Sequence, residues 1–108
     1  MDANAVLQGT LDLMVLKTFE AMGPLHGYGL ARRIEQVSGN ALLLNQGTIY
    51  ASLVRLLHKG WIRSEWGTSE TNRRAKFYAL TPRGRAQLRE QAASWERIAA
   101  LMTRVLEQ

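Results

Sequence analysis

Apolar side chains recur at helical spacing along the first part of the chain. The first such segment covers about residues 8–22. Its apolar residues begin at Leu7 and continue to Phe19, broadly at i, i+4 and i+7, and Gly23-Pro24 ends the segment. Leucines also occupy the other sides of this segment. We therefore expect a helix that lies between other elements.

Two further helices follow. Residues 27–37 alternate an apolar face with an outward face of Arg32, Arg33 and neighbouring polar residues. Asn45 is a good N-cap for a third helix, which Gly60 stops. The apolar stripe of the third helix is formed by Ile49, Leu53, Leu56 and Leu57.

In the second half of the chain the spacing of apolar residues changes from that of a helix to that of strands. Residues 61–66 and 76–80 predict two strands of a β-hairpin, joined by a polar turn over 67–75. Thr81-Pro82 then predicts the start of a long helix that runs to about residue 106. Its apolar seam has heptad-like spacing and comprises Leu88, Ala92, Trp95, Ala99, Met102 and Leu106, widened by Ile98, Leu101 and Val105.

Charge is distributed unevenly along the 108 residues. The net charge is +5, and residues 46–85 hold eight cations against Glu65 and Glu70, whereas the remainder is close to neutral. This excess indicates a surface for a polyanion, either nucleic acid or an anionic membrane. A basic surface kept for solubility is the alternative.

The composition bears on the cellular compartment of the protein. The chain contains no cysteine, so disulfides and thiolate metal sites are excluded, and a reducing compartment fits. No apolar run approaches the roughly 20 residues of a membrane span. The first residues lack the basic region of a signal peptide, so we expect a cytoplasmic protein without a membrane partner.

The third helix carries hydroxyls and cations at helical spacing. Thr48, Ser52, Arg55 and Lys59 share one side, with Ala51 beside them, and we expect this side to face outward. Hydroxyls and Arg can read base edges in a major groove, while Lys suits phosphate. No acid interrupts this face. The alternative is an ordinary helix with solvated cations.

A basic hairpin after a helix pair is the arrangement of a winged helix-turn-helix. The second helix of the pair enters the groove, and the wing, with Arg73, Arg74 and Lys76, reaches a phosphate strand. We therefore expect a mainly α fold with a small β-hairpin. Residues 1–80 would form a winged-helix DNA-binding domain, and residues 81–108 a C-terminal dimerisation helix.

Three stretches, "LHGYGLARRI", "GTIYASLVRLLHKGWI" and "RRAKFYALTPRG", resemble successive signatures of PadR-type transcriptional regulators. The resemblance spans about residues 8–106, with Ala51 where many members have proline. It implies a dimeric winged-helix repressor of the short subclass, with a single C-terminal helix. By motif position it implies DNA contacts from Thr48 and Tyr50, in the motif that Gly47 opens. It also implies that His26, Gly27 and Tyr28 place the second helix near phosphate; packing roles for His26, Tyr28 and Tyr50 are the alternative.

The last helix predicts a homodimer, because a monomer of this size cannot bury its whole apolar face. Trp95 lies in the middle of the seam among alanines. Some PadR-type proteins bind flat hydrophobic compounds between paired aromatic residues at the dimer centre. Trp95 is thus a candidate plate for a small aromatic effector, and interface core is the alternative.

Other function classes have less support. An enzyme is disfavoured because the two histidines, His26 and His58, lie in different helices, and no phosphate loop or paired carboxylate accompanies them. No cofactor and no metal are expected. A winged-helix module that binds protein is the competing hypothesis, and the basic wing favours a double-stranded DNA operator instead.

Overall fold

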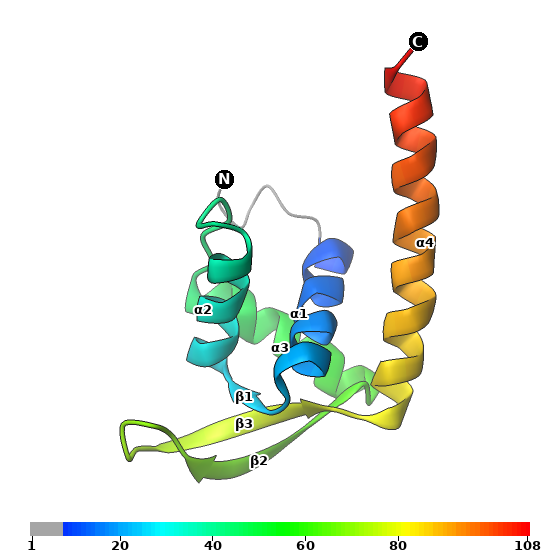
Figure 1. Ribbon diagram of the computed structural model, residues 1–108. Coiled ribbons are helices and arrows are strands. Elements are labelled where there is room, and N and C mark those ends of the chain that lie inside the picture. Colours follow the sequence, from blue (N-terminus) through cyan, green and yellow to red (C-terminus); the bar gives the residue numbers. More distant parts are fainter. Residues whose placement is uncertain (1–7) are drawn as a thin grey trace.

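The computed structural model describes residues 8–108, and its helices and the two hairpin strands follow one another in the predicted order. Each expected helix is present, so the helical predictions are confirmed; Leu7 lies outside the described residues. The first helices form a bundle above a small sheet, and the long last helix stands beside it (Figure 1). The elements are α1 (Gln8–Met22), β1 (Leu25–His26), α2 (Gly27–Val37), α3 (Gln46–Lys59), β2 (Ile62–Thr68), β3 (Arg74–Leu80) and α4 (Pro82–Leu106).

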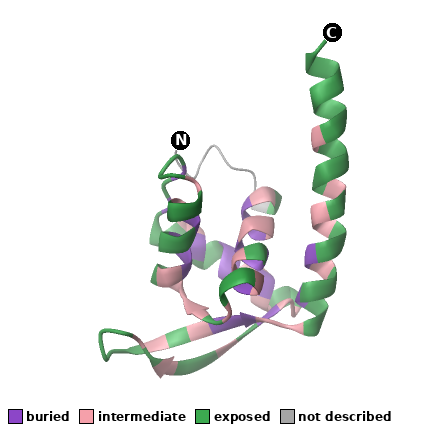
Figure 2. Cartoon of the chain, in the orientation of Figure 1, coloured by how far each residue is buried: buried purple, intermediate pink, exposed green. Residues whose placement is uncertain are grey.

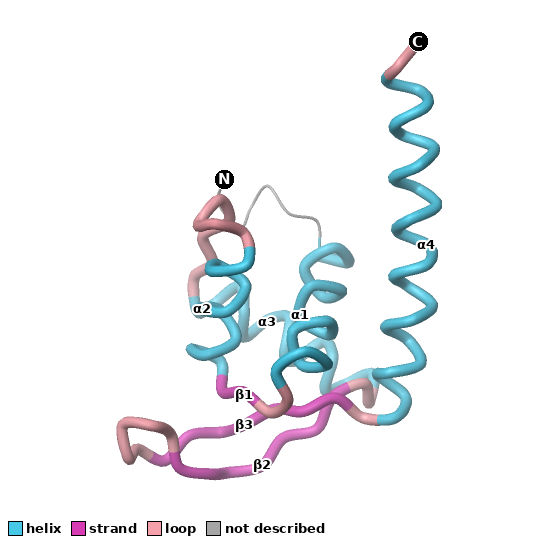
Figure 3. The backbone as a smooth tube through the Cα atoms, viewed as in Figure 1, coloured by secondary structure: helices cyan, strands magenta, loops and turns pink. Residues whose placement is uncertain are grey.

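The sheet has three strands, in the order β1-β3-β2, and not the two strands of a simple hairpin. Leu25 pairs with Tyr78 and His26 with Phe77, so β1 extends the wing on its inner side. A strand of two residues is too short to show alternation in the sequence, and the prediction missed it for that reason. Through β1, the link between α1 and α2 is hydrogen-bonded to the wing (Figure 3).

Local capping sets the helix boundaries. The Asn45 side chain accepts a hydrogen bond from the Thr48 backbone N–H at 2.8 Å, which starts α3. Gly60 ends α3 with a left-handed φ of 74°, a conformation that suits glycine. At the start of α4, the Thr81 hydroxyl accepts a bond from the Gly84 N–H at 3.0 Å.

The core lies where the three helices meet the base of the sheet (Figure 2). As expected, α1 lies between other elements, with α2, α3, α4 and β3 all packed against it. The buried apolar side chains come from every helix. They include Val15, Leu16 and Phe19 of α1, Leu30 and Ile34 of α2, Ile49, Leu53 and Leu56 of α3, Ile62 and Tyr78 of the sheet, and Leu88 of α4.

Helix α4 packs on the domain only through its first turns and then extends beyond the bundle (Figure 1). Leu88 is 4% exposed and belongs to the core of its own chain, so its assignment to a dimer interface is wrong. The rest of the predicted seam is exposed or half-buried. Within residues 8–108, every helix falls short of the length and apolarity that crossing a bilayer requires.

Candidate nucleic-acid interface

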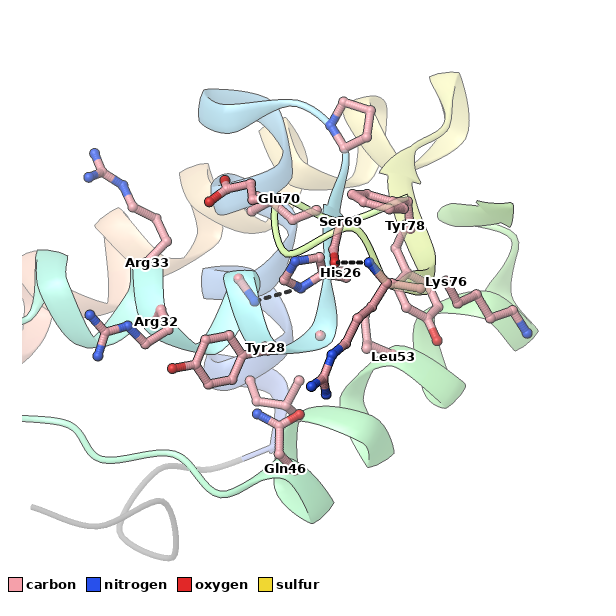
Figure 4. Close-up of a pocket in the computed structure, with 18 of the residues that line it drawn as sticks. His26, Tyr28, Arg32, Arg33, Gln46, Leu53, Ser69, Glu70, Lys76 and Tyr78 are labelled. Atoms are coloured by element: carbon pink, nitrogen blue, oxygen red, sulfur yellow. Dashed lines mark hydrogen bonds between the residues drawn. The ribbon is translucent and has the colours of Figure 1, made fainter. Parts of the chain in front are cut away.

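A cleft of about 1020 Å³ separates α2 and the start of α3 from the wing. Figure 4 shows Arg32 and Tyr28 on its helical side and Lys76 on its wing side. Positive charge borders it on both sides, from Arg32 and Arg33 of α2 and from Arg73, Arg74 and Lys76 of the wing. Glu70 is the acid among these lining residues.

His26 has a structural role at the start of α2. Its Nδ1 accepts a hydrogen bond from the Gly29 N–H at 3.0 Å, which makes it the N-cap of this helix. The ring also packs edge-on against Phe77 of the wing, with ring centres 5.4 Å apart. Tyr28, by contrast, is exposed and points along the cleft (Figure 4). His26 thus has the packing role that was the alternative to a DNA contact, whereas the exposed Tyr28 side chain can contact a ligand.

The polar side of α3 does not face outward as the sequence led us to expect. Ser52 is 0% exposed, and its hydroxyl donates to Oδ1 of Asp12 in α1 at 2.6 Å. Arg55 donates to the same carboxylate twice, from Nε to Oδ2 at 3.0 Å and from Nη2 to Oδ1 at 2.8 Å. The assignment of Ser52 and Arg55 to an exposed reading face is therefore wrong. Both residues join α3 to α1.

These hydrogen bonds are strong because each is accepted by the charged carboxylate of Asp12. The two bonds between Arg55 and Asp12 form a fork, the geometry in which arginine pairs best with a carboxylate. Bonding to Asp12 raises the pKa of Arg55 above its ordinary value. The Arg55 guanidinium is thus held against α1 by Asp12 and does not point to the exposed face of α3.

The exposed face of α3 lies roughly 130° around the helix axis from the predicted one, at 3.6 residues per turn. Tyr50 is 62% exposed on this face. Thr48 is half-buried, and Lys59 lies at the end of the helix over the Trp61 ring, 4.6 Å from its centre. The face consists of Gln46, Gly47, Tyr50, Ala51, the half-buried Val54 and His58.

This face carries no acid and no arginine or lysine. Of the residues on this face, Gly47, Tyr50 and Ala51 are among the predicted DNA contacts, whereas Gln46, Val54 and His58 are not. The signal that would have found them is Asp12, a single acid inside the apolar run LDLMVL, which requires polar partners when that run is buried.

Tyr50 lies close enough to the wing to influence it. Burial raises the pKa of Tyr78, and the nearby Tyr50 phenol adds to this effect. Tyr78 is buried at the inner end of β3, and both tyrosines border the cleft. The exposed face of α3 and the wing therefore belong to one surface.

Trp66 organises the wing cations. It pairs across the hairpin with Lys76 and is 58% exposed, so it is not core. The Arg74 guanidinium lies 4.8 Å from its ring centre and the Lys76 ammonium 6.0 Å, both within cation–π range. At the tip, two hydrogen bonds join Ser69 and Arg73 across the turn. The Ser69 N–H donates to the Arg73 carbonyl, and the Ser69 hydroxyl accepts from the Arg73 N–H. The wing thus presents its cations from a hydrogen-bonded frame.

Residues 8–108 contain no cluster of three or more His, Asp or Glu side chains that would hold a metal ion. The apolar side of α4 is a separate surface. It borders a groove of about 820 Å³ between α4, α1 and α2, with Leu13, Met14, Ala92 and Trp95 among its lining residues. The groove beside α4 and the cleft between the helices and the wing therefore have mostly different lining residues.

Residues 15–90 match the family described as "Transcriptional regulator PadR-like family". An uncharacterised 37.1 kDa protein in transposon TN4556 of Streptomyces fradiae is 41% identical over 78 residues. That match covers 72% of this chain, which spans only 21% of the Streptomyces protein.

Solved structures share the fold over most of the chain. A transcriptional regulator from Clostridium thermocellum superposes with a TM-score of 0.82 at 25% identity, covering 93% of this chain and 96% of that one. Bacillus subtilis PadR, in complex with operator DNA, superposes with a TM-score of 0.66 at 24% identity. That alignment covers 76% of this chain and 46% of PadR, and it supports the winged-helix fold.

Proposed function

This chain belongs to the PadR-like family of transcriptional regulators, and from that premise we propose that it is a sequence-specific DNA-binding repressor acting as a homodimer. The family is one of regulators and not of enzymes. The observation that carries the proposal is the uncharged exposed face of α3 between basic residues of α2 and of the wing.

The proposed contacts divide into two classes. Gln46, Tyr50, Ala51 and Val54 read base edges in the major groove, since an amide, a phenol and small apolar groups suit those edges. The cations hold phosphate and set the position of the helix on the duplex. They are Arg32 and Arg33 on α2 and Arg73, Arg74 and Lys76 on the wing. The Tyr28 and Thr48 hydroxyls and the Gly47 backbone N–H at the start of α3 add neutral donors.

The homodimer is proposed from the exposed side of α4. Trp95, Ile98, Leu101, Met102, Val105 and Leu106 are all about half exposed or more, and Ala92 and Ala99 lie among them. A contiguous apolar surface of this kind is covered by a partner in most soluble proteins. A two-fold axis along α4 also gives two recognition helices for two half-sites.

We also propose that a small aromatic or hydrophobic effector binds at Trp95 and causes the protein to release its operator. The proposal involves no cofactor. A cytoplasmic location places the protein beside its operator. The competing hypothesis, a winged-helix module that binds protein, has less support because both borders of the cleft are basic.

The test begins with genomic fragments selected by the purified wild type. We expect Tyr50→Ala to weaken binding to a selected fragment by about 1–3 kcal/mol and to leave binding to a scrambled duplex unchanged. Arg32→Gln should weaken both. Lys17→Gln is the matched control, since it removes one exposed charge from α1, outside the cleft.

Failure of the wild type to bind any genomic duplex at low salt would contradict the proposal. The protein-binding module would then be the better account of the same exposed face.

A further inference from the structure

Asp12 is the buried acid of the described chain, at 4% exposed, and it belongs to α1 and not to the proposed interface. Its carboxylate accepts three side-chain hydrogen bonds, one from Ser52 and two from Arg55. Both partners are on the proposed recognition helix α3. The single acid thus ties α1 to the element that presents Tyr50.

A carboxylate in this position needs a reason, because burying a charge is costly unless it is paired and hydrogen-bonded. Asp12 meets both conditions. A leucine there would have packed in the core without any partner, since Leu11, Val15 and Leu16 beside it are buried. What an apolar residue cannot supply is direction: apolar burial is non-directional, whereas hydrogen bonds fix distance and angle.

The direction fixed here is the rotation of α3 about its own axis. Ile49, Leu53 and Leu56 give α3 a broad apolar side that tolerates some rotation. Ser52 and Arg55, three positions apart, lie at the edge of that side and are both held by one carboxylate. With that edge fixed, Gln46 and Tyr50 are held toward the cleft, and Val54 follows one turn further along the same exposed face.

We propose that Asp12 is a positioning residue for DNA recognition, acting through Ser52 and Arg55 to fix the face that α3 presents to the groove. This inference rests on the proposed function. It assigns Arg55 to the alignment of the helix, and it places a residue that determines operator affinity in α1, at a position that does not line the cleft.

The charge of Asp12 makes the test sharp. Asp12→Asn keeps the size of the side chain and makes the protein more positive by one charge. Electrostatics alone therefore predicts tighter binding to every duplex. Loss of alignment predicts the opposite for the operator: we expect affinity for a selected genomic fragment to fall about tenfold or more.

Binding to a scrambled duplex of the same composition should stay equal or become tighter, and the salt dependence should not change. Glu20→Gln is the matched control, because it makes the same charge change on the same helix, at a partly exposed position whose charged partners, Lys17 and Arg85, lie outside α3. Arg55→Lys keeps the positive charge but loses the fork to Asp12, and it should reproduce the loss of operator affinity with an unchanged salt slope.

Circular dichroism and thermal melting establish that each variant is folded. Ser52→Ala removes one of the three bonds and serves where Asp12→Asn does not fold, with the same direction of effect expected. An unchanged ratio of operator to scrambled affinity in the folded variants would overturn the inference while leaving the proposed function intact. A wild type that does not distinguish the two duplexes would overturn both.

Discussion

Gly84 of α4 lies directly against the backbone of Trp61: a Cβ atom at position 84 would come within 1.9 Å of the Trp61 carbonyl oxygen. The same oxygen accepts a hydrogen bond from the Thr81 N–H at 3.1 Å. The Thr81 hydroxyl also donates to the carbonyl of Gly60 at 2.8 Å. The end of α3 and the start of α4 are therefore joined without slack, and the direction of α4 is tied to that of α3.

Replacing Gly84 tests this joint. Gly84→Ala forces a methyl group onto a backbone carbonyl, and we expect the free energy of unfolding to fall by about 3 kcal/mol. Urea unfolding followed by circular dichroism measures it. Gly9→Ala is the control, because a methyl group there meets no atom within 4 Å and should cost nothing. Equal midpoints for the two variants would show that the joint is loose.

The wing offers a second prediction. Arg73→Ala and Arg74→Ala should weaken operator and scrambled duplexes alike, and each should lower the salt slope by about one unit. Titrations at several salt concentrations measure both effects. Arg104→Ala in the last turn of α4 is the control for a lost charge, and it should change neither quantity.

Trp66 should modulate the Arg74 effect. Because the indole holds the Arg74 guanidinium at 4.8 Å, Trp66→Leu should reduce the further loss caused by Arg74→Ala, with a coupling of about 0.5–1 kcal/mol. Strictly additive losses would mean that the ring does not orient this cation in the complex.

The boundaries of the helices could be predicted from the sequence because their signals are local. Asn45, Gly60 and Thr81-Pro82 act within one turn of their own positions, and the structure has each cap where it was expected. Strand β1 could not be predicted, since its two residues become a strand only when β3 lies beside them.

The orientation of α3 was mispredicted for a physical reason. A periodicity argument assigns polar residues to solvent, and by that rule Ser52 and Arg55 face outward. The rule fails when a polar partner is buried opposite, and Asp12 lies 40 residues earlier in the chain from Ser52. Only the tertiary structure brings these residues together, and the reading face changes with them.

The exposed side of α4 supplies the fourth prediction. Leu101→Glu or Met102→Glu places a charge in the proposed interface, and we expect the dimer to dissociate because the buried charge would cost several kcal/mol, on the order of 2 or more. Sedimentation velocity measures the change. Ala100→Glu is the control: it adds the same charge at an exposed position on the opposite side of α4 and should leave the dimer intact. A monomeric wild type would contradict the interface itself.

The last prediction concerns Trp95, which is 49% exposed and borders the apolar groove between α4 and α1. In a two-fold dimer a residue in the middle of the seam approaches its own copy, so two indoles flank the axis. Ala92 and Ala99, about one turn to either side, leave room beside them. A planar aromatic compound that fills this room gains apolar burial and ring stacking, about 0.5–1.5 kcal/mol per aromatic pair beyond the area term.

Such a ligand would act on DNA binding through the joint between Gly84 and Trp61, because α4 cannot change its angle without moving α3. A ligand that prefers one angle between the two α4 helices therefore lowers operator affinity by its differential affinity for the two dimer shapes. We expect flat hydrophobic compounds to quench tryptophan fluorescence in the wild type and to weaken operator binding in parallel. Trp95→Ala should lose both responses while Trp61 and Trp66 keep their emission. Quenching that persists in Trp95→Ala would identify the residue as interface core, with packing as its only role.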